Sequence, residues 1–591
     1  MPAPVNTDLS SSNAIPGVYI QVNTAGGSAV DNANKRVMIV GTRLSTGSAA
    51  PDTPGFFAQQ SDVNSSHGQG SEAARLYAAF QSQYGPGEFE VWVTGINEPS
   101  GGTAATRLII TAGTATSAGY VDIFVCGYKV TVGIASGDTA TTIGTAIAAA
   151  INLVLDLPVT AAGTTTVTLT YRHKGLSGND LPIRVDQYDA AGITFSPGTL
   201  LIANAALGGT ISVAVGATVI TEVIANGVSA NDAAGELNTA INAGGYPVTS
   251  TVNAATVTLL YAKGRYVRRI SSGTTDAQQT VTATVGTAGA GVPATTTALA
   301  NISALSKGFA AWVHTFNDPA GAVDAAAAAV AMDSTVNDLV YDTMQADCNG
   351  VNMKPGYVFL GMPGRLAIAG TVVTAAAPDL STTSPLARFC VSWCREPAVQ
   401  AFEIAARHAA IYLHFDYYAK NLDGQVLATR GTVPLLNPAI ADTPPLSDQN
   451  AAIGSYYMSP IITDAQGNLA VLTSKTTSNA SNQDLRESAT IRQIDTARGS
   501  LRQWLVDRFT GRSYRASTPK TPNTVTTTSV ANAAYVWARS LDDQDLFDDA
   551  AKWKDAFVCN VNPVVSTRFD LFVPLAIIRM LHQTGVVLQP Q

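Results

Sequence analysis

The chain has 591 residues, a length that predicts several domains. Only 13% of the residues are charged, the formal net charge is −8, and no run of Lys or Arg stands out, which argues against nucleic acid as the main partner. The polar N-terminus lacks the apolar segment of a signal peptide, and the longest small-apolar run, Ala325 to Met332, is too short to span a bilayer. We therefore expect a soluble, unsecreted protein without membrane insertion and without a nucleic-acid partner.

The low charge content has two interpretations. It is typical of a β-rich protein with many small turns, and also of a subunit largely covered by copies of itself, because interface cores are depleted of charged residues. The five cysteines are an odd number in a long chain and do not indicate a disulfide framework.

Residues 1–30 are expected to form an N-terminal arm. One short apolar stretch within it alternates with period 2, which predicts a β-strand, and Pro16, Gly17 and the pair Gly26-Gly27 interrupt the chain on either side. The residues of this stretch are Val18, Tyr19, Ile20, Gln21 and Val22. A strand isolated in this way has no local partner to pair with.

An α/β core is predicted from two separated regions, residues 31–99 and 299–480. Each region alternates buried apolar runs with helical patterns, an order typical of α/β folds. The expected strands are 35–41, 89–93, 309–316, 357–361 and 389–393, and the expected helices are 70–84 and 318–345. The residues between the two regions are then an insertion.

The insertion contains an internal repeat, which divides it into copies at 100–195 and 196–298. The motif Ala150-Ile151-Asn152 occurs again as Ala240-Ile241-Asn242. A strand pattern that ends at Tyr171 occurs again with its end at Tyr261. Both repeats lie about 90 residues further along the chain. Each copy reads strand, strand, short helix, strand, strand. We therefore expect two tandem, duplicated, small β-rich α+β domains.

Residues 481–575 are expected to form a C-terminal subdomain, followed by an arm at 576–591. Helices are predicted at 485–509 and 529–541, and strands at 557–561, 568–573 and 585–589. The first helix carries Arg492, Arg498 and Arg502 away from its apolar face, and an acidic cluster contains Asp542, Asp543 and Asp545. Each charged set has two interpretations, a partner-facing surface or an ordinary solvated face.

The sequence contains no motif that indicates catalysis. The chain lacks a Walker loop, a dinucleotide turn, a Gly-x-Ser-x-Gly elbow and a His-Glu-x-x-His helix. The best metal candidate combines Cys390, Cys394, His408 and His414, but cysteines four apart on a strand lie roughly 13 Å from each other. We interpret them as buried thiols and ordinary histidines, and expect no catalytic, cofactor or metal site.

The chain resembles the sheath proteins of contractile phage tails of the myovirus type. Three segments carry the resemblance: Ile15 to Ile20 (IPGVYI), Glu487 to Arg498 (ESATIRQIDTAR), and the final strand pair at 568–573 and 585–589. The resemblance implies a multidomain protein with an α/β core built from the N- and C-terminal parts, variable inserted domains and extended arms. It also implies a structural, non-enzymatic subunit that polymerises as stacked six-fold rings around an inner tail tube.

Further expectations follow from that resemblance. The arms would add strands to the sheets of neighbouring subunits, and contraction would drive the tube through the host envelope. Partners would be other sheath subunits, the tail tube protein, and baseplate and tail terminator proteins, in a virion assembled in the bacterial host cytoplasm. The implied intersubunit strand residues are Val18, Tyr19, Ile20, Val22, Val586, Val587 and Leu588, and the tube-facing subdomain would offer Arg492, Arg498, Arg502, Asp542, Asp543 and Asp545.

A secreted β-rich adhesin or surface-layer protein is the main alternative. Richness in Thr, Gly and Ala and the tandem domains favour it, whereas the missing signal peptide and the α/β core disfavour it. A hydrolase with its site in the α/β core would be a third possibility.

Overall fold

The computed structural model describes most of the chain between residues 35 and 576. The described residues are 35–216, 218–305, 308–315, 356–363, 388–415, 422–428, 434–435, 443–476, 486–516, 521, 523–544, 546–564, 568–574 and 576, with the side chains of 498 and 499 excepted. The predicted helix 318–345, the predicted strand 585–589 and both arms lie outside these residues. No helix in the described part is long and apolar enough to cross a membrane.

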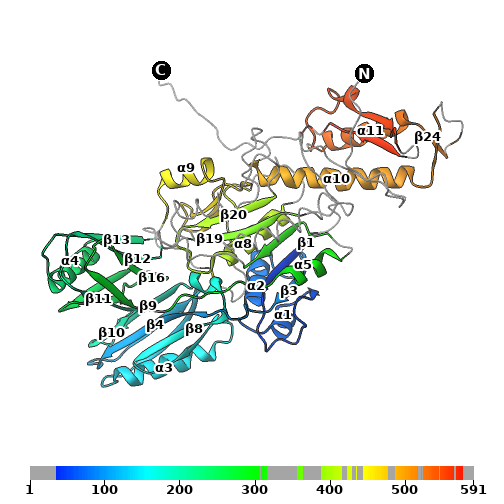
Figure 1. The fold of residues 1–591 in the computed structure, drawn as a ribbon. Coiled ribbons are helices and arrows are strands. Elements are labelled where there is room, and N and C mark those ends of the chain that lie inside the picture. Colours follow the sequence, from blue (N-terminus) through cyan, green and yellow to red (C-terminus); the bar gives the residue numbers. More distant parts are fainter. Residues whose placement is uncertain are drawn as a thin grey trace, which may run out of the picture.

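A mixed eight-stranded sheet forms the core (Figure 1), in the order β2-β3-β1-β18-β19-β20-β21-β22. Its strands are β1 (Arg36–Thr42), β2 (Pro54–Phe57), β3 (Glu90–Ile96), β18 (Ala311–His314), β19 (Val358–Pro363), β20 (Phe389–Cys394), β21 (Ser459–Thr463) and β22 (Leu469–Val471). The six central strands run parallel, and the two edge strands are antiparallel to their neighbours. One sheet therefore joins residues from before and after the insertion.

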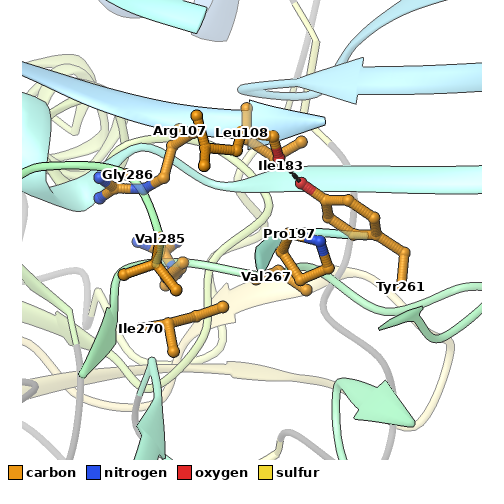
Figure 2. A pocket seen from close by; sticks show the side chains of 10 residues that line it. Arg107, Leu108, Ile183, Pro197, Tyr261, Val267, Ile270, Val285 and Gly286 are labelled. Carbon is orange, nitrogen blue, oxygen red and sulfur yellow. Dashed lines mark hydrogen bonds between the residues drawn. The ribbon is translucent and has the colours of Figure 1, made fainter. Parts of the chain in front are cut away.

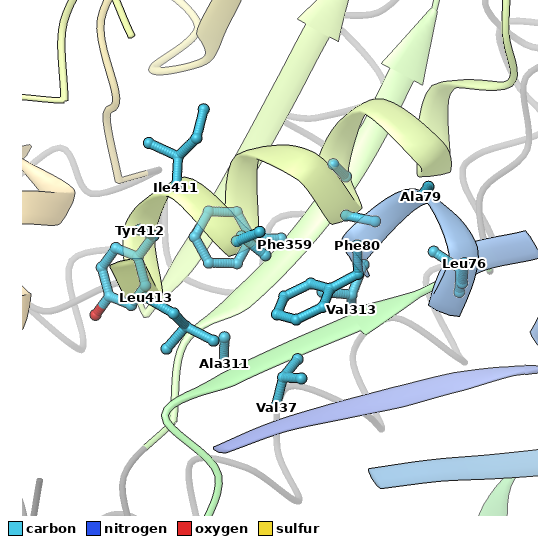
Figure 3. Packing of buried hydrophobic residues seen from close by; sticks show 14 of the residues in the cluster. Val37, Leu76, Ala79, Phe80, Ala311, Val313, Phe359, Ile411, Tyr412 and Leu413 are labelled. Carbon is cyan, nitrogen blue, oxygen red and sulfur yellow. The ribbon is translucent and has the colours of Figure 1, made fainter. Parts of the chain in front are cut away.

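Helices cover both faces of this sheet because its strands are apolar on both sides. Val37 of β1 packs against α2 (Glu72–Tyr84) and α8 (Ala401–His414), as Figure 3 shows, and Ile39 belongs to the same hydrophobic cluster. Met38 and Val40 face the opposite side, where α5 (Thr296–Ser303) and α9 (Leu446–Gly454) pack. The short helix α1 (Gln60–His67) lies beside α2.

The insertion folds into two units, named here unit A (residues 104–196) and unit B (residues 198–284). Unit A contains β4 (Ala104–Gly113), β5 (Gly119–Val125), β6 (Tyr128–Ile134), α3 (Ala140–Leu153), β7 (Val159–Ala162), β8 (Thr166–Lys174), η1 (Leu176–Asp180), β9 (Ile183–Asp189) and β10 (Ile193–Ser196). Unit B contains β11 (Gly198–Ala203), β12 (Gly209–Val215), β13 (Thr218–Ile224), α4 (Ala230–Ala243), β14 (Val248–Asn253), β15 (Thr256–Tyr261), β16 (Ile270–Thr274) and β17 (Thr280–Thr284).

The two units pair their strands in the same way. Unit A forms sheets β10-β4-β8-β7 and β6-β5-β9, and unit B forms the matching sheets β17-β11-β15-β14 and β13-β12-β16. The helix of each unit packs onto these sheets through its buried apolar face. In each unit three strands precede the helix and four follow it, where the sequence predicts two before and two after.

The repeated asparagine has a local structural role in each unit. Asn152, near the end of α3, donates from Nδ2 to the Ala161 carbonyl at 2.8 Å and accepts from the Ala161 amide at 2.9 Å. Asn242 of α4 makes the same pair of bonds with the backbone of Ser250, both at 2.9 Å. Each asparagine therefore ties the helix to the edge strand that follows it.

The C-terminal part is built around one long helix, α10 (Ser488–Phe509). With it lie α11 (Thr527–Asp542), η4 (Lys554–Ala556) and the strand pairs β23 (Ser513–Tyr514) with β24 (Thr524–Val525) and β25 (Val558–Val561) with β26 (Phe569–Phe572). Figure 1 places this part and the insertion on opposite sides of the core.

The predicted boundary between core and C-terminal subdomain at residue 481 does not match the packing. Ile491 and Ile494, in the first half of α10, belong to the hydrophobic cluster of the core. Leu501 and Leu505, in the second half, pack instead with α11. An amphipathic pattern reports an apolar face but not which partner covers it, so the sequence could not show that α10 serves two cores.

Replacing Asn152 with Ala removes two side-chain bonds to the Ala161 backbone. We expect a loss of about 1–2 kcal/mol of local stability, since each net hydrogen bond contributes about 1 kcal/mol. Hydrogen exchange at the Ala161 amide measures this directly. Asn226→Ala, at an exposed turn of unit B, is the control and should leave that exchange rate unchanged.

Candidate assembly site

The first half of α10 is anchored in the core by a buried ion pair. Arg388, directly before β20, donates from Nη2 to Asp495 Oδ1 at 2.7 Å and from Nη1 to Asp495 Oδ2 at 2.9 Å. The same guanidinium donates to the Gly356 carbonyl at 3.0 Å. Both side chains are at most 2% exposed. A bidentate, fully desolvated pair of this kind fixes the orientation of the helix as well as its position.

The second half of α10 is held by α11. Trp504 donates from Nε1 to the Ala533 carbonyl at 2.9 Å, and Trp537 donates from Nε1 to Ser500 Oγ at 3.0 Å. Around these two tryptophans the apolar side chains of both helices form a separate small core. The second half of α10, α11 and β23 to β26 together are called the C-terminal subdomain. Helix α10 therefore links the core to this subdomain.

The arginines predicted to contact a partner occupy different environments. Arg502 is exposed on α10, whereas Arg492 is only 4% exposed and lies over the ring of Tyr412, 5.6 Å from its centroid. Arg492 was expected on the surface, and its burial in the core corrects that expectation. The reason is that the residue lies in the core-embedded half of α10, where every face of the helix is covered. The side chain of Arg498 lies outside the part of the chain that the structure describes.

The acidic residues lie where α11 ends. Asp542 Oδ2 accepts from the Ala550 amide at 3.1 Å, and Arg539 lies 3.9 Å from Asp542 and 4.0 Å from Asp543. Asp543 is exposed, and Asp545 lies outside the described residues. Exposed ion pairs at such distances contribute little stability, so Asp543 stays available for contact with another molecule.

The β25–β26 pair offers edges to which further strands could be added. Its strands pair only with each other among the described residues, in the antiparallel register Val558 to Phe572 and Val561 to Phe569. Phe572 remains 44% exposed at one end. The pair packs on α11, and the unpaired backbone groups along its outer edges are a template for another strand.

A second buried polar cluster joins the insertion to the core. Glu72 of α2 accepts from Tyr171 at 3.0 Å and from Thr315 at 2.9 Å, and Arg75 forms a buried ion pair with Glu403 of α8. Asp180 of unit A accepts from the Ala401 amide at 2.7 Å, at the N-terminus of α8, where a carboxylate is favoured. This cluster leaves no pattern in the sequence, because its members are single charged or polar residues scattered over four distant segments.

The candidate metal ligands do not converge. His408 is fully buried between Ser392 and Ser474, 2.8 Å from each hydroxyl, and its Nδ1 lies 3.9 Å from Cys390 Sγ. His414 instead stacks on Tyr84 and contacts Glu88 at 3.1 Å. Burial raises the pKa of the Cys390 thiol to about 12, so it stays protonated. Among the described residues no group of His, Cys, Asp and Glu could hold a metal ion.

Comparison with known proteins gives one curated relative. The Mu-like prophage FluMu tail sheath protein of Haemophilus influenzae is 31% identical over 184 residues. The chain is similar to a tail sheath protein. The aligned segment covers 31% of this chain and 37% of that relative, so the chain matches little more than a third of the relative's length. No protein-family model matches the chain.

Two solved structures are similar to the chain, with lower sequence identity than the curated relative. A sheath tail protein from Listeria innocua aligns over 89% of this chain and 88% of its own, with 12% identity and a TM-score of 0.36. A chain of the anti-feeding prophage baseplate aligns over 44% of this chain and 66% of its own, with 14% identity and a TM-score of 0.31. Scores this low carry no argument about a shared fold, so the resemblance to sheath proteins rests on the curated relative.

Asp495→Asn should destabilise the protein strongly. The substitution leaves the Arg388 charge buried without its anionic partner, an arrangement that costs about 3–5 kcal/mol. Chemical denaturation followed by tryptophan fluorescence measures the change. Asp507→Asn, on the exposed face of the same helix, is the matched control and should shift stability by less than about 0.5 kcal/mol. Equal effects of both substitutions would contradict the anchoring role of Asp495.

Acid should destabilise the core through two buried histidines. Burial lowers the pKa of both His314 and His408 from 6.5 to about 3. Between these pH values the histidines bind protons in the unfolded chain but not in the folded chain. Their contribution to the free energy of unfolding is therefore fully present above pH 6.5 and is lost as the pH is lowered toward 3. Each histidine contributes a slope of about 1.4 kcal/mol per pH unit.

Denaturation curves between pH 6 and pH 4 test this contribution. His408→Gln should reduce the slope by about 1.4 kcal/mol per pH unit, even if the variant is less stable at neutral pH. A slope identical to that of the unsubstituted protein would show that His408 takes up its proton in the folded state.

Proposed function

We propose that the chain is a structural subunit of a contractile tail sheath that polymerises as stacked six-fold rings around an inner tail tube. The 184-residue match to a prophage tail sheath protein is the observation that carries the proposal. Contraction of the polymer would drive the tube through the host envelope. The subunit would be part of a virion, assembled in the host cytoplasm, with tube, baseplate and tail terminator proteins as its partners.

The terminal arms are proposed to connect the subunits. Val18, Tyr19, Ile20 and Val22 at one end, and Val586, Val587 and Leu588 at the other, would pair as strands with neighbouring copies. The edges of the β25–β26 sheet are the acceptor we favour, because among the described residues neither strand pairs with a further strand. Each arm would contribute several hydrogen bonds of about 1 kcal/mol, and several arms per subunit would make the lattice effectively permanent.

The C-terminal subdomain is proposed to face the tube. Arg502, Asp542 and Asp543 remain candidates for contact with the tube or a neighbour, and Arg498 and Asp545 remain so from the sequence alone. Charged contacts of this kind would set the register between partners more than the strength of binding. Arg492 is excluded from this role by its burial.

Units A and B are proposed to be a duplicated pair that decorates the sheath. Their matching element order, strand pairing and asparagine bonds support a common origin. Their position on the side of the core opposite the C-terminal subdomain would place them away from the tube (Figure 1).

Removal of either arm should block polymerisation without unfolding the core. Deletion of residues 1–25, or of the last eight residues, takes away one of the two exchanged strands. Sedimentation and negative-stain images would then show monomers or small oligomers, while circular dichroism stays that of a folded protein.

A point substitution within the arm gives a sharper test. Ile20→Pro removes a backbone donor from the proposed strand and should reduce polymer formation, since proline interrupts strand pairing. Thr7→Pro lies in the same arm outside the strand and should have no effect. Unchanged polymerisation after both truncations would refute strand exchange between subunits.

A further inference from the structure

A small cleft lies where units A and B meet (Figure 2). Arg107 and Leu108 of β4 line one side, and Tyr261, Val267, Arg268 and Gly286 line the other. The cleft has room for about one sphere the size of a water molecule. Its walls are apolar apart from the two arginines and the tyrosine hydroxyl.

Arg107 is buried in this cleft without a compensating anion. It is 6% exposed, and it donates from Nη1 to the Thr106 carbonyl at 2.8 Å and from Nη2 to the Asn179 carbonyl at 2.9 Å. Its Nε has no hydrogen-bond partner. Among the described residues no carboxylate forms an ion pair with it. Carbonyl groups satisfy two of its donors but leave its charge unbalanced.

The neighbouring arginines add further positive charge around Arg107. Arg268 is matched by Asp180, with which it forms a buried ion pair, and by Glu396 Oε2 at 3.1 Å from its Nε. Burial, together with the positive charges of Arg269 and Arg268, lowers the pKa of Arg107 to about 10, so the group stays charged at neutral pH. A buried guanidinium among other cations is costly unless an anion lies beside it.

The cleft is framed by close contacts between the two units. Ile183 and Val267 exchange backbone hydrogen bonds of 2.9 and 2.6 Å, and the Tyr261 hydroxyl donates to the Leu108 carbonyl at 2.7 Å. Gly286 allows the closest approach, since a Cβ there would lie 2.0 Å from the Thr106 carbonyl oxygen. These contacts hold Arg107 in place, so the guanidinium cannot turn toward solvent to regain hydration.

We propose that this cleft binds a single chloride ion, held by Arg107 Nε at the joint between units A and B. The small volume excludes phosphate, sulfate and carboxylate ligands. The lining residues carry two arginines and no carboxylate, which favours an anion, and chloride is more easily stripped of water than sulfate or phosphate. The ion would balance the Arg107 charge and thereby stabilise the packing of the two units against each other.

Bromide diffraction of the full-length protein tests the site directly. Crystals in which sodium bromide replaces sodium chloride should show an anomalous peak within hydrogen-bond reach of Arg107 Nε. Only water density at this position would overturn the proposal. A peak of equal height in crystals of Arg107→Met would mean an adventitious ion and would also overturn it.

Thermal unfolding supplies an independent measurement in solution. At constant ionic strength, with sodium gluconate exchanged for sodium chloride, the midpoint should rise with chloride, because a ligand bound only to the folded state stabilises it. Above the dissociation constant, a tenfold rise in chloride raises the folding equilibrium constant about tenfold. Arg107→Met should abolish this response, and Lys263→Met, at an exposed position outside the cleft lining, should retain it.

A chloride response that is identical in the two variants would refute the role of Arg107. If Arg107→Met does not fold, the bromide experiment on the unsubstituted protein decides the question alone. Neither measurement depends on polymerisation, so failure here would leave the proposed sheath function unaffected.

Discussion

The buried pair between Arg388 and Asp495 determines how the large parts of this protein are connected. It fixes the first half of α10 at the edge of the parallel sheet, and the second half of the same helix carries the C-terminal subdomain. A long helix embedded at both ends transmits displacement, because its backbone hydrogen bonds resist bending. Any movement of the core must therefore also move the subdomain, which we propose to face the tube.

The insertion is tied to the core with comparable rigidity. Asp180 contacts the N-terminus of α8, Tyr171 contacts Glu72, and Arg268 of the segment between β15 and β16 pairs with Glu396 of the core. These contacts are buried, so breaking them would leave charges without partners. Buried polar contacts thus join the insertion to the core, and the proposed arms are the parts that would adapt as neighbouring subunits move. This division of roles suits a polymer that changes shape while staying connected.

The sequence predicted the regular elements well, because they depend on local patterns. β1, β19 and β20 are continuous apolar runs, as expected of strands buried on both faces, and α2 and α10 follow helical periodicity. Asn152 and Asn242, which belong to the repeated sequence motif, make the same pair of backbone contacts in the two units. The mixed α/β architecture was therefore accessible without a structure.

Long-range relations could not be predicted in the same way. The helical periodicity of α10 predicts that Arg492 is exposed. Only the packing of α10 into the core shows that this residue is buried beside Tyr412. The pairing of Arg75 with Glu403 spans more than 300 residues and leaves no periodic signal. All the proposed arm and contact residues stay predictions, and the arm residues, Asp545 and the side chain of Arg498 also lie outside the described part of the chain.

The most direct measurement is a cryo-EM reconstruction of the assembled full-length protein, in which both chain ends are traced. The account predicts six-fold rings in which residues 18–22 and 586–588 of one molecule lie as β-strands against sheets of adjacent molecules. A reconstruction in which both ends pair only with their own subunit would contradict it, as would an assembly without rings.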